Sequence, residues 1–201
     1  MTDEREYEAR AAEVRHRTAN SFQLISALAR MRGQRSGEPE ARRQLLWIAD
    51  AVGALGALER HRCEGGVDFT AYLTEMSPVW SRRPGGEVSQ VAVAADPMTA
   101  ADQVASTLAL IAHELVANAL VHGCQGRQGR VEVRLTHLGD GRSELAVADD
   151  GQGFDPAAPQ TRERFGLWFV RSLAQQVRGE LDLSSGQGFC ARLVFPFADG
   201  R

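Results

Sequence analysis

The sequence contains no lysine, and all 23 of its strongly basic residues are arginine. A chain without lysine cannot use the phosphate-binding lysine of a P-loop, a Schiff-base lysine or the strand lysine of eukaryotic-type protein kinases. Any phosphate chemistry in this chain must therefore rely on backbone amides, arginine and a metal ion.

A strong net charge is also missing. The 23 arginines face 26 acidic residues, which leaves a formal net charge of -3. Such a chain has no overall basic field to attract nucleic acid or an anionic membrane. We expect neither as a partner.

Cysteine and long apolar runs are scarce as well. Three cysteines without a C-x-x-C pair argue against a disulfide framework or a zinc ribbon and fit a reducing cytosol. The start MTDEREYEAR has no apolar run typical of a signal peptide, and polar residues interrupt the longest apolar stretch, around 104–121. We expect a cytoplasmic protein without a sensor domain of its own.

Helical spacing of apolar residues dominates the first third of the chain. Residues 3–32 contain no proline or glycine, and residues 33–39 read as a loop. In the next segment an a/d seam consists of Ala41, Leu45, Ile48, Val52 and Leu55, with Glu59 at its end. These patterns predict an antiparallel helical hairpin that pairs with a second copy into a four-helix bundle, giving a homodimer. The alternative is a hairpin that packs on the rest of its own chain.

After Gly65 and Gly66 the pattern changes to mixed strands and helices. Asp68 is expected to cap a short helix, and Val88, Val91 and Val93 indicate a strand. Helices are predicted at 99–122 and 166–178, and strands at 130–137, 143–149, 180–184 and 189–195. The predicted fold class is α+β, with the hairpin at 1–64 and an α/β sandwich at 65–201.

The first chemical motif is HELVANALVHG, in which Glu114, Asn118 and His122 are spaced by four. On an α-helix this spacing places the three side chains on one face. Carboxylate and carboxamide oxygens are ligands that Mg²⁺ accepts, although an ordinary solvent-facing polar stripe has the same pattern. A zincin site is excluded, because Ala117 stands where the second histidine of H-E-x-x-H belongs.

Two further motifs follow. In LAVADDGQGFDP a strand leads to Asp149, Gly151 and Gly153, which places a carboxylate at a strand end beside glycines that permit close backbone approach. In RFGLWFVRSL, Gly166 and Leu167 open an amphipathic helix whose free N–H groups form an anion site. Taken singly, these motifs are also typical of an ordinary turn and a core helix.

The order of these motifs resembles the GHKL ATP-binding domain of histidine kinases, Hsp90-type chaperones, MutL and gyrase B, over roughly residues 88–197. The resemblance implies that Asn118 coordinates Mg²⁺ and that Asp149 accepts a hydrogen bond from the adenine amino group of ATP. It further implies that Gly151 and Gly153 let the loop pass over the base and that 154–165 form a lid over the phosphates. The implied nucleotide-contacting set is completed by His122, Gly166 and Leu167.

Residues 13–31 resemble the phosphoacceptor helix of histidine kinases with the motif H-R-x-x-N-x-x-Q. Here the motif corresponds to His16, Arg17, Asn20 and Gln23. The resemblance implies that His16 is phosphorylated. Arg15 and Arg17 beside a neutral imidazole agree with this, because arginine attracts and neutralises a phosphoryl group.

Some positions depart from the family pattern. Val121, Phe165 and Phe189 replace the expected lysine, glycine and threonine, and we interpret all three changes as losses on the phosphate side of the site. The W-x-E signature of the HWE kinases is absent as well, so the chain resembles their sister group. Arg162 and Arg164 in the predicted lid have the fork geometry to replace the lost phosphate contacts.

We interpret the chain as a histidine kinase that phosphorylates His16 from Mg-ATP and passes the group to an aspartate of a response regulator receiver domain. Glu114 is the candidate to orient or deprotonate the imidazole, and a separate sensor protein would supply the input. One alternative is a histidine phosphotransferase with a degenerate ATP site that relays phosphate between regulators. A second is a GHKL serine kinase acting as an anti-sigma factor, which the hairpin and the His16 motif disfavour.

Overall fold

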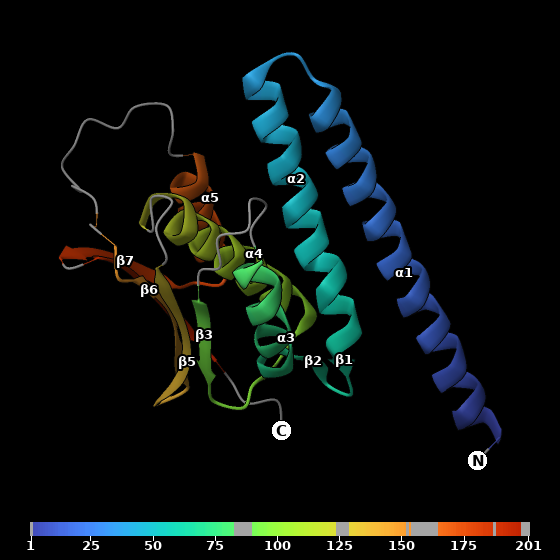
Figure 1. Cartoon of the computed structure of the whole chain (residues 1–201). Helices are drawn as coiled ribbons and strands as arrows, with labels where there is room; N and C mark the ends of the chain where they lie inside the picture. Colours follow the sequence, from blue (N-terminus) through green and yellow to red (C-terminus); the bar gives the residue numbers. More distant parts are fainter. Residues whose placement is uncertain are drawn as a thin grey trace. The chain divides into compact units, whose positions relative to one another are not determined.

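The computed structural model describes residues 2–82, 90–123, 129–151, 153, 165–186 and 188–197. The chain divides into two compact units, Met1–Arg62 and Cys63–Arg201. Figure 1 shows the helices and strands of each unit. Val88 and the predicted lid at 154–164 lie outside the described residues.

The first unit is a pair of antiparallel helices, α1 (Thr2–Arg35) and α2 (Pro39–Leu58), followed by a short 3₁₀ turn, η1 (Glu59–His61) (Figure 1). Pro39 begins α2, where its missing N–H has no helical partner to lose. Small residues let the two helices approach closely, since a Cβ on Gly56 would lie 3.1 Å from the Cβ of Phe22. Helix α1 continues through Gly33, which the sequence placed in the loop; this glycine is buried against Leu45.

Apolar side chains on both helices of the hairpin lie at its surface within one chain. In the a/d seam of α2, Ile48 is exposed and the other four apolar residues are half-buried, whereas Ala49, on a neighbouring face of α2, is fully buried. The Ser26 hydroxyl donates to the Ala49 carbonyl at 2.7 Å, which places that face against α1. On α1 the exposed apolar residues are Val14, Leu24, Ile25, Leu28 and Met31. The pairing of these faces with a second copy stays a prediction.

The second unit contains a mixed five-stranded sheet in the order β3-β5-β6-β8-β7, in which β3 and β5 are parallel and the other neighbours antiparallel. A small sheet has the order β1-β2-β4. The strands are β1 (Arg62–Cys63), β2 (Gly66–Asp68), β3 (Gln90–Ala95), β4 (Thr99–Ala100), β5 (Arg130–Gly139), β6 (Arg142–Asp149), β7 (Glu180–Gly186) and β8 (Gly188–Pro196).

Helices α3 (Phe69–Ser81), α4 (Asp102–Asn118) and α5 (Phe165–Gln176) lie on one side of the five-stranded sheet (Figure 1). The core between them is formed by alternate sheet residues such as Val133, Val147 and Leu193 and by α4 residues such as Leu108 and Leu115. The predicted α+β class is therefore confirmed. Asp68 caps α3 as expected, because its side chain accepts from the Ala71 N–H at 2.9 Å.

The predicted helix at 99–122 differs at both ends. Thr99 and Ala100 form β4, because they pair with Asp68 and Val67 of β2. At the other end α4 passes into a π-helical turn, η2 (Ala119–Gly123). Within the described part of the chain, the stretch Asp102–Val121 is long and apolar enough to cross a membrane, but 61% of its apolar window is buried in the protein. Its burial is that of a core helix.

Candidate functional site

The carboxylate of Asp149 at the end of β6 is held by two backbone donors. Its Oδ1 accepts from the Gly151 N–H at 2.9 Å and from the Phe189 N–H at 3.3 Å. The side chain is only 8% exposed, and its Oδ2 is buried without a hydrogen-bond partner among the described residues. A buried acceptor of this kind is costly unless a donor reaches it, which makes Oδ2 a candidate to accept a hydrogen bond from a ligand.

Glycines allow the chain to close around this carboxylate. Gly188 has a φ of 100°, and a Cβ there would overlap the carbonyl of Asp149. Gly153 has a φ of 69°, and a Cβ there would overlap the Ser185 hydroxyl and lie 2.8 Å from the Gly188 oxygen. The loop after β6 therefore passes against the turn between β7 and β8, which gives Gly153 a structural role.

Gly188 and the backbone of Phe189 contact Asp149. The sequence motifs did not predict that these two residues belong to the site. We placed Phe189 on the phosphate side, but its N–H donates to Asp149, so it lies at the carboxylate expected to receive adenine. Its side chain is buried, so the missing threonine hydroxyl leaves this backbone contact intact. The G-Q-G run before Phe189 was the available signal, since a second glycine pair marks a second close backbone approach.

A second cluster lies where α4 meets the start of α5. The Asn118 amide nitrogen donates to Glu114 Oε1 at 3.4 Å, and Glu114 is only 6% exposed. Gly166 packs against both, since a Cβ there would overlap Glu114 Oε1 and lie 3.1 Å from the Asn118 nitrogen. The structure thus brings together three predicted site residues, and Leu167 follows half-buried in α5.

The predicted ladder of side chains ends at Asn118. From Ala119 onward the helix is π-helical, and its N–H···O pattern spans five residues rather than four. His122 belongs to this π turn, and its side chain is not among the described ones. The π turn contacts β6 and β8, the strands that carry Asp149 and Gly188 near their ends. Turns of this kind are frequent at functional sites.

His113, the residue before Glu114, contributes to the packing of the domain. The Trp80 indole N–H donates to His113 Nδ1 at 3.2 Å, and Trp80 is buried. This bond requires a lone pair on Nδ1, so the imidazole contributes to the α3–α4 contact as a neutral ring.

His16 lies exposed on α1, away from these clusters in the sequence and in the other unit. Asn20, one turn later, has its amide nitrogen 3.3 Å from His16 Nδ1. Arg17 forms an ion pair with Glu13 at 2.5 Å, with both side chains more than half exposed. The arginine that we expected to attract phosphate is therefore partly neutralised, and Arg15 is half-buried.

The arginines of the predicted lid cannot be placed in the site, because they are not among the described residues. Arg162, Arg164 and the side chain of Phe165 are not among the described residues. In the described part of the chain, no group of three or more histidine, cysteine, aspartate or glutamate side chains is placed to hold a metal. A Mg²⁺ ion held by Asn118, water and phosphate does not need such a group.

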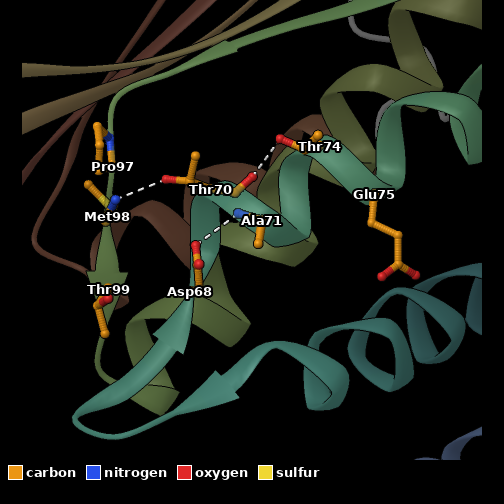
Figure 2. Close-up of a pocket in the computed structure, with 8 residues that line it drawn as sticks. All are labelled: Asp68, Thr70, Ala71, Thr74, Glu75, Pro97, Met98 and Thr99. Carbon is orange, nitrogen blue, oxygen red and sulfur yellow. Dashed lines mark hydrogen bonds between the residues drawn. The ribbon is translucent and has the colours of Figure 1, made fainter.

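An open cavity of about 730 Å³ lies beside α3 and β4 (Figure 2). Two of the polar side chains that line it serve the fold. Asp68 caps α3, while the Thr70 hydroxyl donates to the Asp96 carbonyl at 2.8 Å and accepts from the Met98 N–H at 2.9 Å. Asp149, whose Oδ2 is buried without a hydrogen-bond partner among the described residues, is the better candidate for a binding site.

Residues 103–199 match the family model of histidine kinase-, DNA gyrase B- and HSP90-like ATPases. The chain is 26% identical over 194 residues to blue-light-activated histidine kinase 2 of Erythrobacter litoralis, covering 90% of this chain and 55% of that protein. It is 28% identical over 190 residues to the sensor histidine kinase PdtaS of Mycolicibacterium smegmatis, covering 89% of this chain and 36% of that protein.

Among solved structures, the histidine kinase domain of the Erythrobacter litoralis blue-light-activated kinase matches with a TM-score of 0.66 at 24% identity, covering 98% of this chain and 95% of that domain. The second unit is a GHKL-type ATP-binding domain, a fold whose family members bind ATP. The chain itself is a relative of the bacterial histidine kinases, as its motifs predicted. It spans about half or less of the length of these curated relatives.

Proposed function

We propose that this protein is a histidine kinase that phosphorylates His16 from Mg-ATP and transfers the phosphoryl group to an aspartate of a response regulator receiver domain. The observation that carries the proposal is the Asp149 carboxylate, which has one oxygen held by the backbone and the other buried without a partner among the described residues. An acceptor held in this way fits the exocyclic amino group of adenine.

The second cluster supports the phosphate end of the site. When bound, Mg-ATP supplies the phosphoryl group and the metal charge that neutralises it. Because the nitrogen of the Asn118 amide points to Glu114, its oxygen is the atom left to bind Mg²⁺. The close contact of Gly166 with Glu114 and the Asn118 amide nitrogen brings the first turn of α5, with its free N–H groups, next to this cluster. Arg162 and Arg164 remain part of the proposal as phosphate contacts.

Glu114 has a different role in this proposal from the one that its motif suggested. Its carboxylate is buried and bonded to Asn118, so it orients the proposed metal ligand. An action of Glu114 on the His16 imidazole would require this carboxylate to leave the contact with Asn118 and Gly166.

The hairpin supports a homodimer with an exposed phosphoacceptor. Ile25 follows His16 by nine positions, which is about two and a half helical turns, so the two side chains lie on opposite sides of α1. A second copy can therefore cover the exposed face around Ile25 and leave His16 open to phosphate. We extend the proposal to a cytoplasmic location, input from a separate sensor protein, and modules at 1–64 and 65–201; these rest on the sequence.

The test is labelling of the purified chain with ATP carrying radioactive γ-phosphate in the presence of Mg²⁺. We expect a label that is labile in acid and stable in alkali, as phosphohistidine is. His16→Gln should abolish it, and Asn118→Ala should strongly reduce it. The matched control His61→Gln removes another imidazole of the same unit and should keep the label. Full labelling of the His16→Gln variant would contradict the assignment.

A phosphotransferase with a degenerate ATP site is the second candidate. It is favoured by Val121, an apolar side chain that is 57% exposed at the position where a lysine was expected. Calorimetry with ATP and ADP separates the two functions. No binding at millimolar nucleotide, combined with phosphate transfer from a phosphorylated regulator to His16, would support the phosphotransferase.

A further inference from the structure

Phe189 lies directly opposite Asp149 in the five-stranded sheet. Strands β6 and β8 are antiparallel and pair Ala148 with Cys190, so the next pair along the two strands is Asp149 with Phe189. Side chains of directly opposed residues lie on the same face of such a sheet, with Cβ atoms about 4.5–5.5 Å apart. Both residues belong to the buried face, since each is only 8% exposed. The side chain of Phe189 is therefore the cross-strand neighbour of the Asp149 carboxylate.

The backbone at Phe189 is held against Asp149 by two contacts. The Phe189 N–H donates to Asp149 Oδ1 at 3.3 Å. The preceding residue, Gly188, has a φ of 100° and lies so close to the Asp149 carbonyl that a Cβ there would overlap it. These contacts fix the position of the Phe189 Cβ relative to the carboxylate.

The side chain of Phe189 differs in chemistry from the threonine expected at its position. A threonine hydroxyl donates and accepts hydrogen bonds, whereas a phenyl ring offers an apolar face and edge. Phe189 therefore provides no hydroxyl to a base or to Asp149 Oδ2, which has no hydrogen-bond partner among the described residues. A ligand that reaches this carboxylate meets one buried acceptor and, beside it, an aromatic side chain.

The π turn η2 contacts the same two strands, β6 and β8. Its residues Ala119 and Leu120 are apolar and buried, and it directly follows Asn118, the proposed Mg²⁺ ligand. Ligand sites in proteins are mostly apolar, with a few polar groups that fix the orientation of the ligand. One buried carboxylate oxygen in apolar surroundings suits a flat aromatic base that carries an amino group.

We propose that the ring of Phe189 packs against the base of the bound nucleotide and makes the site specific for a purine. This inference rests on the proposed binding of ATP at Asp149. The Asp149 oxygen alone does not separate adenine from cytosine, because both bases carry an exocyclic amino group that donates a hydrogen bond. Adenine has two fused rings and cytosine has one. Contact with an aromatic side chain favours the larger base through its buried area and through the geometry of ring packing.

Binding of ADP and CDP to the full chain tests this role. Titration calorimetry measures ADP, and competition against ADP measures CDP. Phe189→Leu keeps an apolar side chain but removes the ring, so we expect it to lower the preference for ADP over CDP about two- to tenfold. Phe189→Met is a second variant that removes the ring and should have the same effect. The matched control Phe195→Leu removes another buried ring further along the same face of β8 and should leave the preference unchanged.

An unchanged preference in both Phe189 variants would overturn the proposal. Tighter binding of ADP by either variant than by the unmodified chain would also overturn it, because the ring would then occupy the place of the base. Absence of binding of both nucleotides to the unmodified chain at millimolar concentration would do the same. Failure of the kinase function is distinguishable, since these titrations need neither His16 nor a γ-phosphate: the chain would then not label from Mg-ATP, while its preference for ADP would still depend on Phe189.

Discussion

Replacing Asp149 with asparagine should change which purine base the protein prefers. The substitution keeps an oxygen at Oδ1 for the N–H groups of Gly151 and Phe189, and it exchanges the buried Oδ2 acceptor for an N–H donor. The adenine amino group would then face another donor. Hypoxanthine carries a carbonyl oxygen at the same ring position and would accept from the new amide.

The magnitude follows from the bond that is lost. A hydrogen bond to a charged group contributes about 1.5–3 kcal/mol, which corresponds to roughly a ten- to hundredfold change in affinity. We expect ADP to bind Asp149→Asn more weakly by this factor. The preference for ADP over inosine diphosphate should fall at least as far, because the inosine nucleotide gains a hydrogen bond.

Titration calorimetry of both nucleotides with both proteins measures this preference directly. Asp150→Asn is the matched control, because Asp150 is the next residue, is exposed and accepts from the Arg130 N–H at 2.9 Å through an oxygen that asparagine retains. Its nucleotide preference should equal that of the unmodified protein. If Asp149→Asn kept the original preference for ADP, the assignment of Oδ2 to the adenine amino group would be refuted.

Two further predictions concern the fold. Gly188→Ala should lower the free energy of unfolding by about 1–3 kcal/mol through backbone strain alone, and by more through overlap with the Asp149 carbonyl. Gly186→Ala is the control and should have little effect, because a Cβ there meets open space. Denaturant unfolding measures both variants, and equal losses of stability would contradict the packing around Gly188. Ile25→Asp should convert a dimer into a monomer at micromolar concentration, because it places a carboxylate in the expected apolar interface. Light scattering measures the molar mass of both proteins. A monomeric unmodified protein would show that the interface is not formed.

Local patterns predicted the elements whose causes are local. The spacing of apolar residues located the helices and the strands of the five-stranded sheet, and Asp68 was recognised as an N-cap because that bond joins residues three positions apart. The predicted start of α4 at residue 99 was wrong. Thr99 and Ala100 form a strand because they pair with β2, about thirty residues earlier in the chain. The π turn after Asn118 was also missed, because an α-helical spacing was assumed through His122.

The sequence alone determined the class of the protein. Its motifs and their order predicted the GHKL domain and the histidine kinase family. Each motif is a run of neighbouring residues, so its chemistry can be recognised without the fold. Tertiary structure decided how the candidate site is built. The support of Asp149 by Phe189, the overlap that forbids a side chain at Gly188 and the contact of Gly166 with Glu114 each join residues that are about forty to fifty positions apart. Such contacts arise only when the sheet and helices pack, so no spacing in the sequence reveals them.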